Sequence, residues 1–370
     1  MLDPKRSLFH WGPISACPLF MYFTIEPAFA PLKNLFGTCY PQSTILFWEN
    51  KVLWLLDNQE FAEYSKKFTD SVILNATNRR RYFSIWNDRT KNLIDVFKQL
   101  DKSNISKLSK DALVALYRKF SKVYYDWWTI TISLELVTVT LEPKLGGQLK
   151  KFYKNNEKEY TSDFSVLTSP LTLTFYRQEQ KDLLSILTLP KNIQHEALKK
   201  HQQQYYWMLN SYLEGKILDF NYFKTELGKA EKTNYKAILQ EILYYPSEIK
   251  KRKEKIYSKI APSKKFLELA SLVEKFSTLQ DERKMYNFLG DHYLQEFANA
   301  FSRTTHLETN QLKLLVLNEL PNALVENDST KIQKRKIALV MDASDQEIVH
   351  FDGPNALMIV NQGSVHPRGW

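Results

Sequence analysis

His201 and Tyr205 are a pair of side chains whose types and spacing suit the binding of a ligand. They stand four residues apart, so a helix places both on one face. Such a face lines a groove for a ligand, or it packs against a second helix with His201 hydrogen-bonded to a neighbour. The sequence leaves both interpretations open.

Arg283 is a second candidate for contact with a ligand. Residues 266–279 carry apolar side chains at helical spacing, and extending that stripe places Arg283 beside Phe276 and Leu279. A charged side chain on such a face is costly unless it has a partner. Arg283 therefore binds a phosphate or carboxylate ligand through its guanidinium group, or it forms an ion pair between helices.

A strongly basic run covers residues 250–265, with eight basic residues and one acidic residue, Glu254. Such a run binds a polyanion such as RNA by releasing its counterions, or it is a solvated helix face or a linker. It contributes +7 to a chain whose net charge is +10. The candidate polyanion contacts are Lys250, Lys251, Arg252, Lys253 and Lys255.

The histidines, cysteines and glycines of the sequence do not form the pattern of a metal or nucleotide site. None of the seven histidines pairs with another at metal-ligand spacing on one helical turn, and two cysteines are too few for a zinc site. The ten glycines are not spaced for a Rossmann, P-loop or kinase-type nucleotide site. We therefore assign no catalytic residue, no metal site and no cofactor.

The composition is typical of a globular protein, with 370 residues, 44% hydrophobic and 25% charged. The most membrane-like stretch, residues 127–141, contains Glu135 and has 15 residues, whereas a bilayer span needs about 20 apolar residues. No convincing signal peptide opens the sequence. We therefore expect a soluble, cytoplasmic protein that is not embedded in a membrane.

Hydrophobic patterning predicts a mainly α-helical fold, a bundle-like body with a short N-terminal β-hairpin and a small β-rich C-terminal tail. Three consecutive segments are expected: an irregular, proline-rich segment with the hairpin over residues 1–57, an α-helical domain over residues 58–330, and the tail over residues 331–370. The expected strands are residues 44–48 and 52–56 in the hairpin, and 337–341, 347–351 and 357–360 in the tail.

Polar residues before apolar stripes predict where helices begin. Asp57 or Asn58 caps the helix that follows the hairpin, and Ser109 caps a later one. The longest helix is expected over residues 263–303.

Two prolines are expected at helix ends, and one alternating stretch leaves the choice between helix and strand open. Pro170, after Ser169, is expected in the first turn of a helix, where proline is favoured, and Pro246 is expected to end a pair of short helices. Residues 127–141 alternate apolar and polar side chains, which favours a strand, although their neighbours on both sides favour a helix.

Several pieces of the sequence occur in an order that one protein family shares. They are residues 108–113 (LSKDAL), 168–172 (TSPLT) before 182–184 (DLL), 201–212, 279–284 (LQDERK), 316–320 (VLNEL) and the tail ending in 353–356 (GPNA). Together they resemble the helical region that precedes the swivelling phosphohistidine domain in proteins related to phosphoenolpyruvate synthase and pyruvate phosphate dikinase. The resemblance covers roughly residues 45–360 and implies that residues 127–141 are helical.

The catalytic parts of that family are not found in this sequence. There, a mobile domain carries a histidine in a T-x-G-G-x-x-S-H-like motif and an ATP-grasp domain supplies the nucleotide chemistry. Here the one Gly-Gly pair, Gly146 and Gly147, has no histidine nearby. The resemblance therefore implies a non-catalytic helical module whose tail leads toward a mobile domain beyond Trp370 or on a partner.

Two further interpretations of the function of the chain stay open. The chain is a phosphotransferase of the same family whose missing domains are supplied in trans, in which case Arg283 lies in a pocket with other polar groups. Alternatively, it is a basic, all-α scaffold that binds RNA or another polyanion through the run of residues 250–265.

Overall fold

The computed structural model describes residues 6–153, 156–324 and 329–363. Within these ranges the chain is mainly α-helical with one five-stranded sheet, which confirms the predicted fold class. None of the helices described combines the length and apolar character that a bilayer crossing needs.

The chain forms two compact units. The first unit comprises Met1–Val137, Ser211–Gly215 and Gly290–Trp370, and the second comprises Thr138–Asn210 and Lys216–Leu289. These units do not follow the three consecutive segments expected from the sequence: the hairpin and the tail lie in one unit, and residues 58–330 are divided between both. The difference arises because separated stretches of chain share one core.

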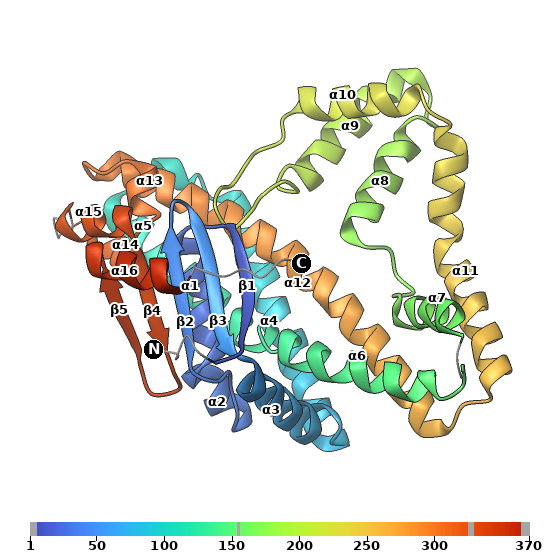
Figure 1. The fold of residues 1–370 in the computed structure, drawn as a ribbon. Coiled ribbons are helices and arrows are strands. Elements are labelled where there is room, and N and C mark those ends of the chain that lie inside the picture. Colours follow the sequence, from blue (N-terminus) through green and yellow to red (C-terminus); the bar gives the residue numbers. More distant parts are fainter. Residues whose placement is uncertain (1–5, 154–155, 325–328, 364–370) are drawn as a thin grey trace. The chain divides into compact units, whose positions relative to one another are not determined.

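The sheet belongs to the first unit and is antiparallel throughout, in the order β1-β3-β2-β4-β5 (Figure 1). The predicted hairpin is confirmed: its two strands are joined by Glu49 and Asn50, both with positive φ, as a two-residue turn between twisted strands requires. Ile45 of β2 faces Met341 of β4, so the hairpin and the tail form one sheet. The strands are β1 Leu8–Ser15, β2 Ser43–Trp48, β3 Lys51–Asp57, β4 Leu339–Ala343 and β5 Ile348–Asp352.

The expectation of irregular structure over residues 1–43 is wrong for the described part of that segment. It contains β1 and two short helices, α1 Pro18–Ile25 and α2 Ala30–Phe36. Pro18 and Pro31 stand in the first turns of these helices, where a missing N–H breaks no hydrogen bond. The prolines therefore start elements in a segment where they suggested irregular chain.

The third strand expected in the tail, residues 357–360, is also wrong. These residues lie in a helix, α16 Pro354–Gly363, and the Leu357 N–H donates to the Gly353 carbonyl. Gly353 has a φ of 81°, which turns the chain sharply after β5, and Pro354 follows at the first helical position. A short apolar run does not by itself distinguish a strand from a buried helical turn.

The helices of the first unit confirm the predicted caps. Asp57 accepts a hydrogen bond from the Glu60 N–H, and Ser109 accepts one from the Ala112 N–H. The elements between the hairpin and residue 131 are α3 Asn58–Phe68, a π-helical turn Thr69–Ile73, α4 Ala76–Lys102, a short 3-10 helix Ile105–Lys107 and α5 Lys110–Thr131. Short helices before the tail strands are α13 Thr309–Leu312, α14 Glu319–Asn322 and α15 Ser329–Ile337.

Residues 127–141 are helical, as the resemblance implies. They belong to the end of α5 and the start of α6 Leu134–Lys150, with a short turn between. Apolar residues such as Trp128 and Ile130 are buried, but so are the intervening Thr129 and Thr131. A helix buried on all sides loses its amphipathic pattern, so the alternation does not report a strand.

The second unit consists of helices with their own apolar clusters. They are α7 Glu157–Thr168, α8 Phe175–Ile186, α9 Lys191–Tyr205, α10 Phe220–Glu231 and α11 Tyr235–Ile260, with most of α6 and the first part of α12 Lys264–Thr304. The predicted long helix over residues 263–303 is confirmed as α12.

Two expected helix ends in this unit are wrong. Ser169 follows the end of α7, and the next helix starts at Phe175, capped by the hydroxyl of Thr174. Pro246 lies inside α11, which continues to Ile260. A proline costs the helix one hydrogen bond and introduces strain, and buried residues on both sides, Ile242 and Ile249, hold the helix together here.

Candidate functional site

His201 and Tyr205 lie on one face of α9, and both are buried. The Nε2 atom of His201 is 2.9 Å from an oxygen of Glu179, and the Tyr205 hydroxyl donates to Asp182 at 2.6 Å. Glu179 and Asp182 stand three residues apart on α8, so the two contacts join the same faces of two helices. Of the two interpretations left open by the sequence, helix packing is the one that these contacts match.

Burial and the neighbouring carboxylates of Asp182 and Glu179 raise the pKa of Tyr205, so its hydroxyl stays protonated and acts as a donor. The ring of His201 lies 4.7 Å from that of Tyr205 and 5.1 Å from that of Phe223 in α10. His201 therefore combines one polar contact with packing in the apolar core of the second unit.

A cavity of about 710 Å³ lies within the second unit, a size typical of small-molecule pockets. It is lined by α8, α10, the first turn of α11 and the loop between α9 and α10. Glu179 contributes to the wall, whereas His201 and Tyr205 are not among the lining residues. The pair thus positions a wall residue and does not itself form the groove.

The two cationic side chains that line this cavity have partners along their own helices. The Arg177 guanidinium donates to Gln180 at 3.0 Å, and the Lys229 ammonium lies 2.6 Å from Glu226. Arg177 and Lys229 are balanced in number by two lining carboxylates, Glu179 and Glu226, so the wall presents no net charge to a ligand. The cavity has no evident preference for anions or cations.

Arg283 lies on α12 in the second unit, half-buried and outside the lining of this cavity. The two roles predicted for Arg283, a contact with a ligand and an ion pair between helices, both stay predictions. The neighbouring Asp281 has a structural role, because its carboxylate accepts the Phe175 N–H at 2.9 Å at the start of α8. Burial raises the pKa of Asp281, and the Phe175 N–H offsets part of that rise.

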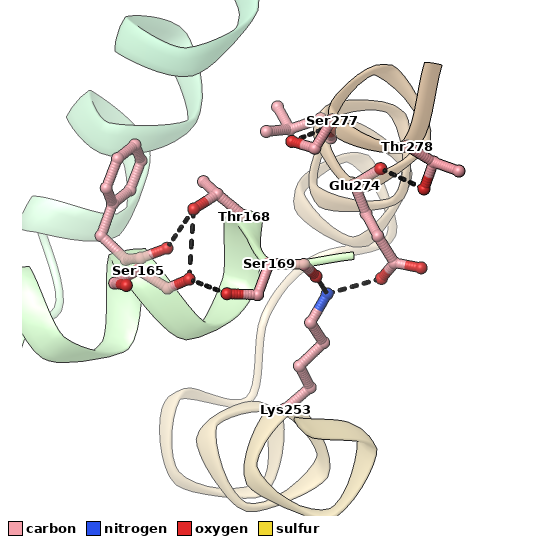
Figure 2. Close-up of polar contacts among 9 residues, drawn as sticks. Ser165, Thr168, Ser169, Lys253, Glu274, Ser277 and Thr278 are labelled. Carbon is pink, nitrogen blue, oxygen red and sulfur yellow. Dashed lines mark hydrogen bonds and ion pairs between the residues drawn. The ribbon is translucent and has the colours of Figure 1, made fainter. Parts of the chain in front are cut away.

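Lys253, one of the five candidate polyanion contacts, is 4% exposed. Its ammonium donates to the Ser169 carbonyl and to Glu274 Oε2, both at 2.6 Å, so α11 is joined to the end of α7 and to α12 (Figure 2). A buried cation with two partners is not available to a polyanion. The prediction for Lys253 is therefore corrected: this residue supports the fold of the second unit.

The other four candidates are exposed on α11. Lys251, Arg252 and Lys255 occupy positions i, i+1 and i+4, which a helix brings onto one side, and we call these three residues the basic face. Lys251 lies 3.1 Å from the exposed Glu248. Among the described residues Lys250, Arg252 and Lys255 form no ion pair. The basic face is thus a solvated patch of positive charge.

Burial also decides the state of the two cysteines, which lie in the first unit without a disulfide between them. It raises the pKa of the Cys17 thiol to about 12 and that of Cys39 to about 11. Both are therefore neutral thiols at pH 7, and a neutral thiol is a poor nucleophile.

Arg335 of α15, whose side chain is 2% exposed, is a buried cation that was not predicted from the sequence. Its guanidinium group contacts both oxygens of Glu319, one oxygen of Asp352 and the Leu314 carbonyl. These contacts join α14, α15 and β5 in the first unit. A cluster of Lys334, Arg335 and Lys336 gave no signal that its middle member is buried.

Within the part of the chain that the structure describes, no group of three or more His, Cys, Asp or Glu side chains is placed to hold a metal ion. Comparison of the chain with protein-family models, curated proteins and solved structures gives no match.

Proposed function

We propose that the chain is a non-catalytic helical module of the phosphoenolpyruvate synthase-like kind, which acts with a partner domain that carries a phosphohistidine. The proposal rests on the resemblance over residues 45–360, and it requires a partner because this sequence holds no Gly-Gly…Ser-His motif. Any phosphotransfer is then carried out by the partner, while this chain supplies a binding surface.

The observation that supports this proposal is the helical state of residues 127–141. Local alternation favours a strand over these residues, whereas the resemblance requires a helix, and α5 and α6 cover most of the stretch. A helix over these residues is what the resemblance and the helical neighbours on both sides favour, against the alternation itself, and the proposal draws its support from that agreement.

The experiment begins with the DNA that follows the Trp370 codon and with the neighbouring genes. A continuing frame or adjacent gene for a Gly-Gly…Ser-His domain supplies the partner, which is purified and mixed with this chain. We expect a complex in sedimentation velocity, and we expect it to persist when the partner's histidine is replaced by alanine, because docking precedes transfer. No such gene nearby, or no complex, contradicts the proposal.

A second candidate function, binding of RNA or another polyanion, is favoured by the basic face. Arg252 and Lys255 are exposed and have no ion pair within the described residues, and Lys251 has only an exposed one. Phosphates reach such cations without breaking a buried contact, and the release of counterions drives the binding. Lys250 lies beside the face and adds to its field.

This function is tested with a variant in which the three cations of the basic face are reversed, K251E/R252E/K255E. Lys253 stays unchanged, because its loss acts on the fold. Fluorescence anisotropy with labelled duplex RNA is expected to show tight binding at low salt, with log affinity falling by about 0.9 per phosphate contact for each tenfold rise in salt. The basic-face variant is expected to lose this binding.

The matched control is K102E/K107E/K110E, which reverses three exposed lysines of the first unit that form no ion pair within the described ranges. It changes the net charge of the chain by the same amount as the basic-face variant. We expect it to retain most of the affinity. Equal loss in both variants assigns the binding to net charge and contradicts a site on α11.

A further inference from the structure

An exposed aromatic ring lies on the same helix as the basic face. Tyr244 of α11 is 58% exposed and makes no ring contact within the described residues, and the adjacent Leu243 is 57% exposed. Tyr244 precedes Lys251 by seven residues, which is nearly two full turns. Both side chains therefore lie on nearly the same side of the helix.

Distances along the helix suit a short strand of nucleic acid. At 1.5 Å per residue, Tyr244 and Lys255 are about 16 Å apart along the axis. At about 3.4 Å per stacked nucleotide, this length corresponds to roughly five nucleotides. An aromatic ring followed by a row of cations is the combination that single-stranded nucleic acids bind, with a base on the ring and phosphates on the cations.

We propose that α11 binds single-stranded nucleic acid, with a base stacked on Tyr244 and the backbone phosphates held by Lys251, Arg252 and Lys255. The proposal rests on the second proposed function and names its ligand class. A duplex meets the same cations, but its bases are paired and stacked on each other and present no free face to a tyrosine. Tyr244 therefore distinguishes single strands from duplexes.

The carboxylate of Glu248 is expected to repel the phosphates of this ligand. Glu248 is exposed between Tyr244 and Lys251 on the same side of α11, and it lies 3.1 Å from the Lys251 ammonium. A phosphate that reaches Lys251 displaces this contact and meets the negative charge of Glu248. Glu248→Gln removes the repulsion and is expected to raise affinity for every polyanion.

The experiment compares labelled oligouridine, labelled duplex RNA and heparin in binding titrations with the intact chain and its variants. Tyr244→Ala is expected to weaken oligouridine binding at least about fivefold and to leave duplex RNA and heparin binding unchanged, because stacking is lost and charge is not. Tyr244→Phe keeps the ring and is expected to bind oligouridine like the parent. Oligothymidine in place of oligouridine shows whether the 2′-hydroxyl contributes.

The outcomes distinguish polyanion binding in general from the binding of single strands through Tyr244. If no probe binds the parent chain, the polyanion function is wrong and this inference falls with it. If all probes bind and Tyr244→Ala weakens none of them, or weakens all of them equally, the polyanion function stands and the single-strand assignment is overturned. Far-ultraviolet circular dichroism checks that each variant retains the helix content of the parent.

Discussion

The ammonium of Lys253 lies 2.6 Å from the carboxylate of Glu274, and the lysine is buried while the carboxylate keeps partial contact with water. The pair links α11 to α12, and the Ser169 carbonyl accepts a second hydrogen bond from the ammonium. One cation of the basic run is thus committed to the interior of the second unit, while its neighbours in sequence are exposed.

Replacement of this lysine measures what the link contributes. Lys253→Met keeps an unbranched side chain but leaves Glu274 and the Ser169 carbonyl without their donor, and we expect a loss of about 2–3 kcal/mol in the free energy of unfolding. Lys255→Met, on the exposed side of the same helix, is the control and should change that energy by less than about 0.5 kcal/mol. Urea unfolding followed by circular dichroism gives both values, and equal stabilities would show that the contact contributes nothing.

The contact between Arg335 and Glu319 predicts a dependence of stability on pH. Burial raises the pKa of Glu319, but the Arg335 guanidinium outweighs this and holds the pKa below its usual value of 4.5. The contact therefore stabilises the fold above about pH 4.5, and the stabilisation is lost as the pH falls through the folded-state pKa. Urea midpoints measured over this range should fall more steeply for the parent than for Glu319→Gln. Glu254→Gln, at an exposed site, should follow the parent.

Asp291 predicts the opposite dependence. It is fully buried, and burial raises its pKa well above the usual value even though the Tyr124 hydroxyl lowers it in part. Its protonated form favours folding, so stability is greatest below the unfolded pKa and decreases as the pH rises toward the folded one. Asp291→Asn should therefore gain about 1 kcal/mol over the parent at pH 7. The gain should shrink at acid pH, and a constant difference across the range would contradict the assignment.

Two helical glycines predict opposite effects of the same substitution. A Cβ at Gly290 in α12 would lie 2.4 Å from the ring of Tyr124, which is fully buried, whereas a Cβ at Gly147 in α6 meets nothing within 4 Å. Gly290→Ala should cost about 2 kcal/mol through overpacking. Gly147→Ala should stabilise the chain by about 0.5–1 kcal/mol, because alanine loses less backbone entropy in a helix. Thermal unfolding of both variants tests the pair, and the same sign in both would refute the packing at Gly290.

Local signals in the sequence were sufficient where one residue acts on its own neighbours. The caps Asp57 and Ser109 and the β2–β3 hairpin follow from short-range chemistry, and each was predicted. The pairing of Ile45 with Met341 was not, because strands so far apart in sequence carry no mark of their partner. The prolines near the N-terminus misled, since the same residue that interrupts a helix also begins one.

In the candidate site, too, features set by neighbouring residues could be predicted, whereas partners distant in sequence could not. The shared face of His201 and Tyr205 was predictable from their spacing, but their acceptors on α8 come from another helix and had no local signal. The burial of Lys253 did have a local signal in the sequence. Lys253 lies four residues after Ile249 and three before Ile256, so helical periodicity places it on the apolar side of α11. Applying that periodicity within the basic run would have separated the buried cation from the exposed ones.

The pairing of β2 with β4 has a consequence for synthesis of the chain. Ribosomes add about 5–20 residues per second, so β2 leaves the exit tunnel on the order of tens of seconds before β4 exists to cover its edge. During that interval an apolar strand presents unpaired backbone groups, which invite pairing with other nascent chains. Completion of this sheet is therefore a late event, and the cell's protection of the β2 edge by chaperones should influence how much protein reaches its native form.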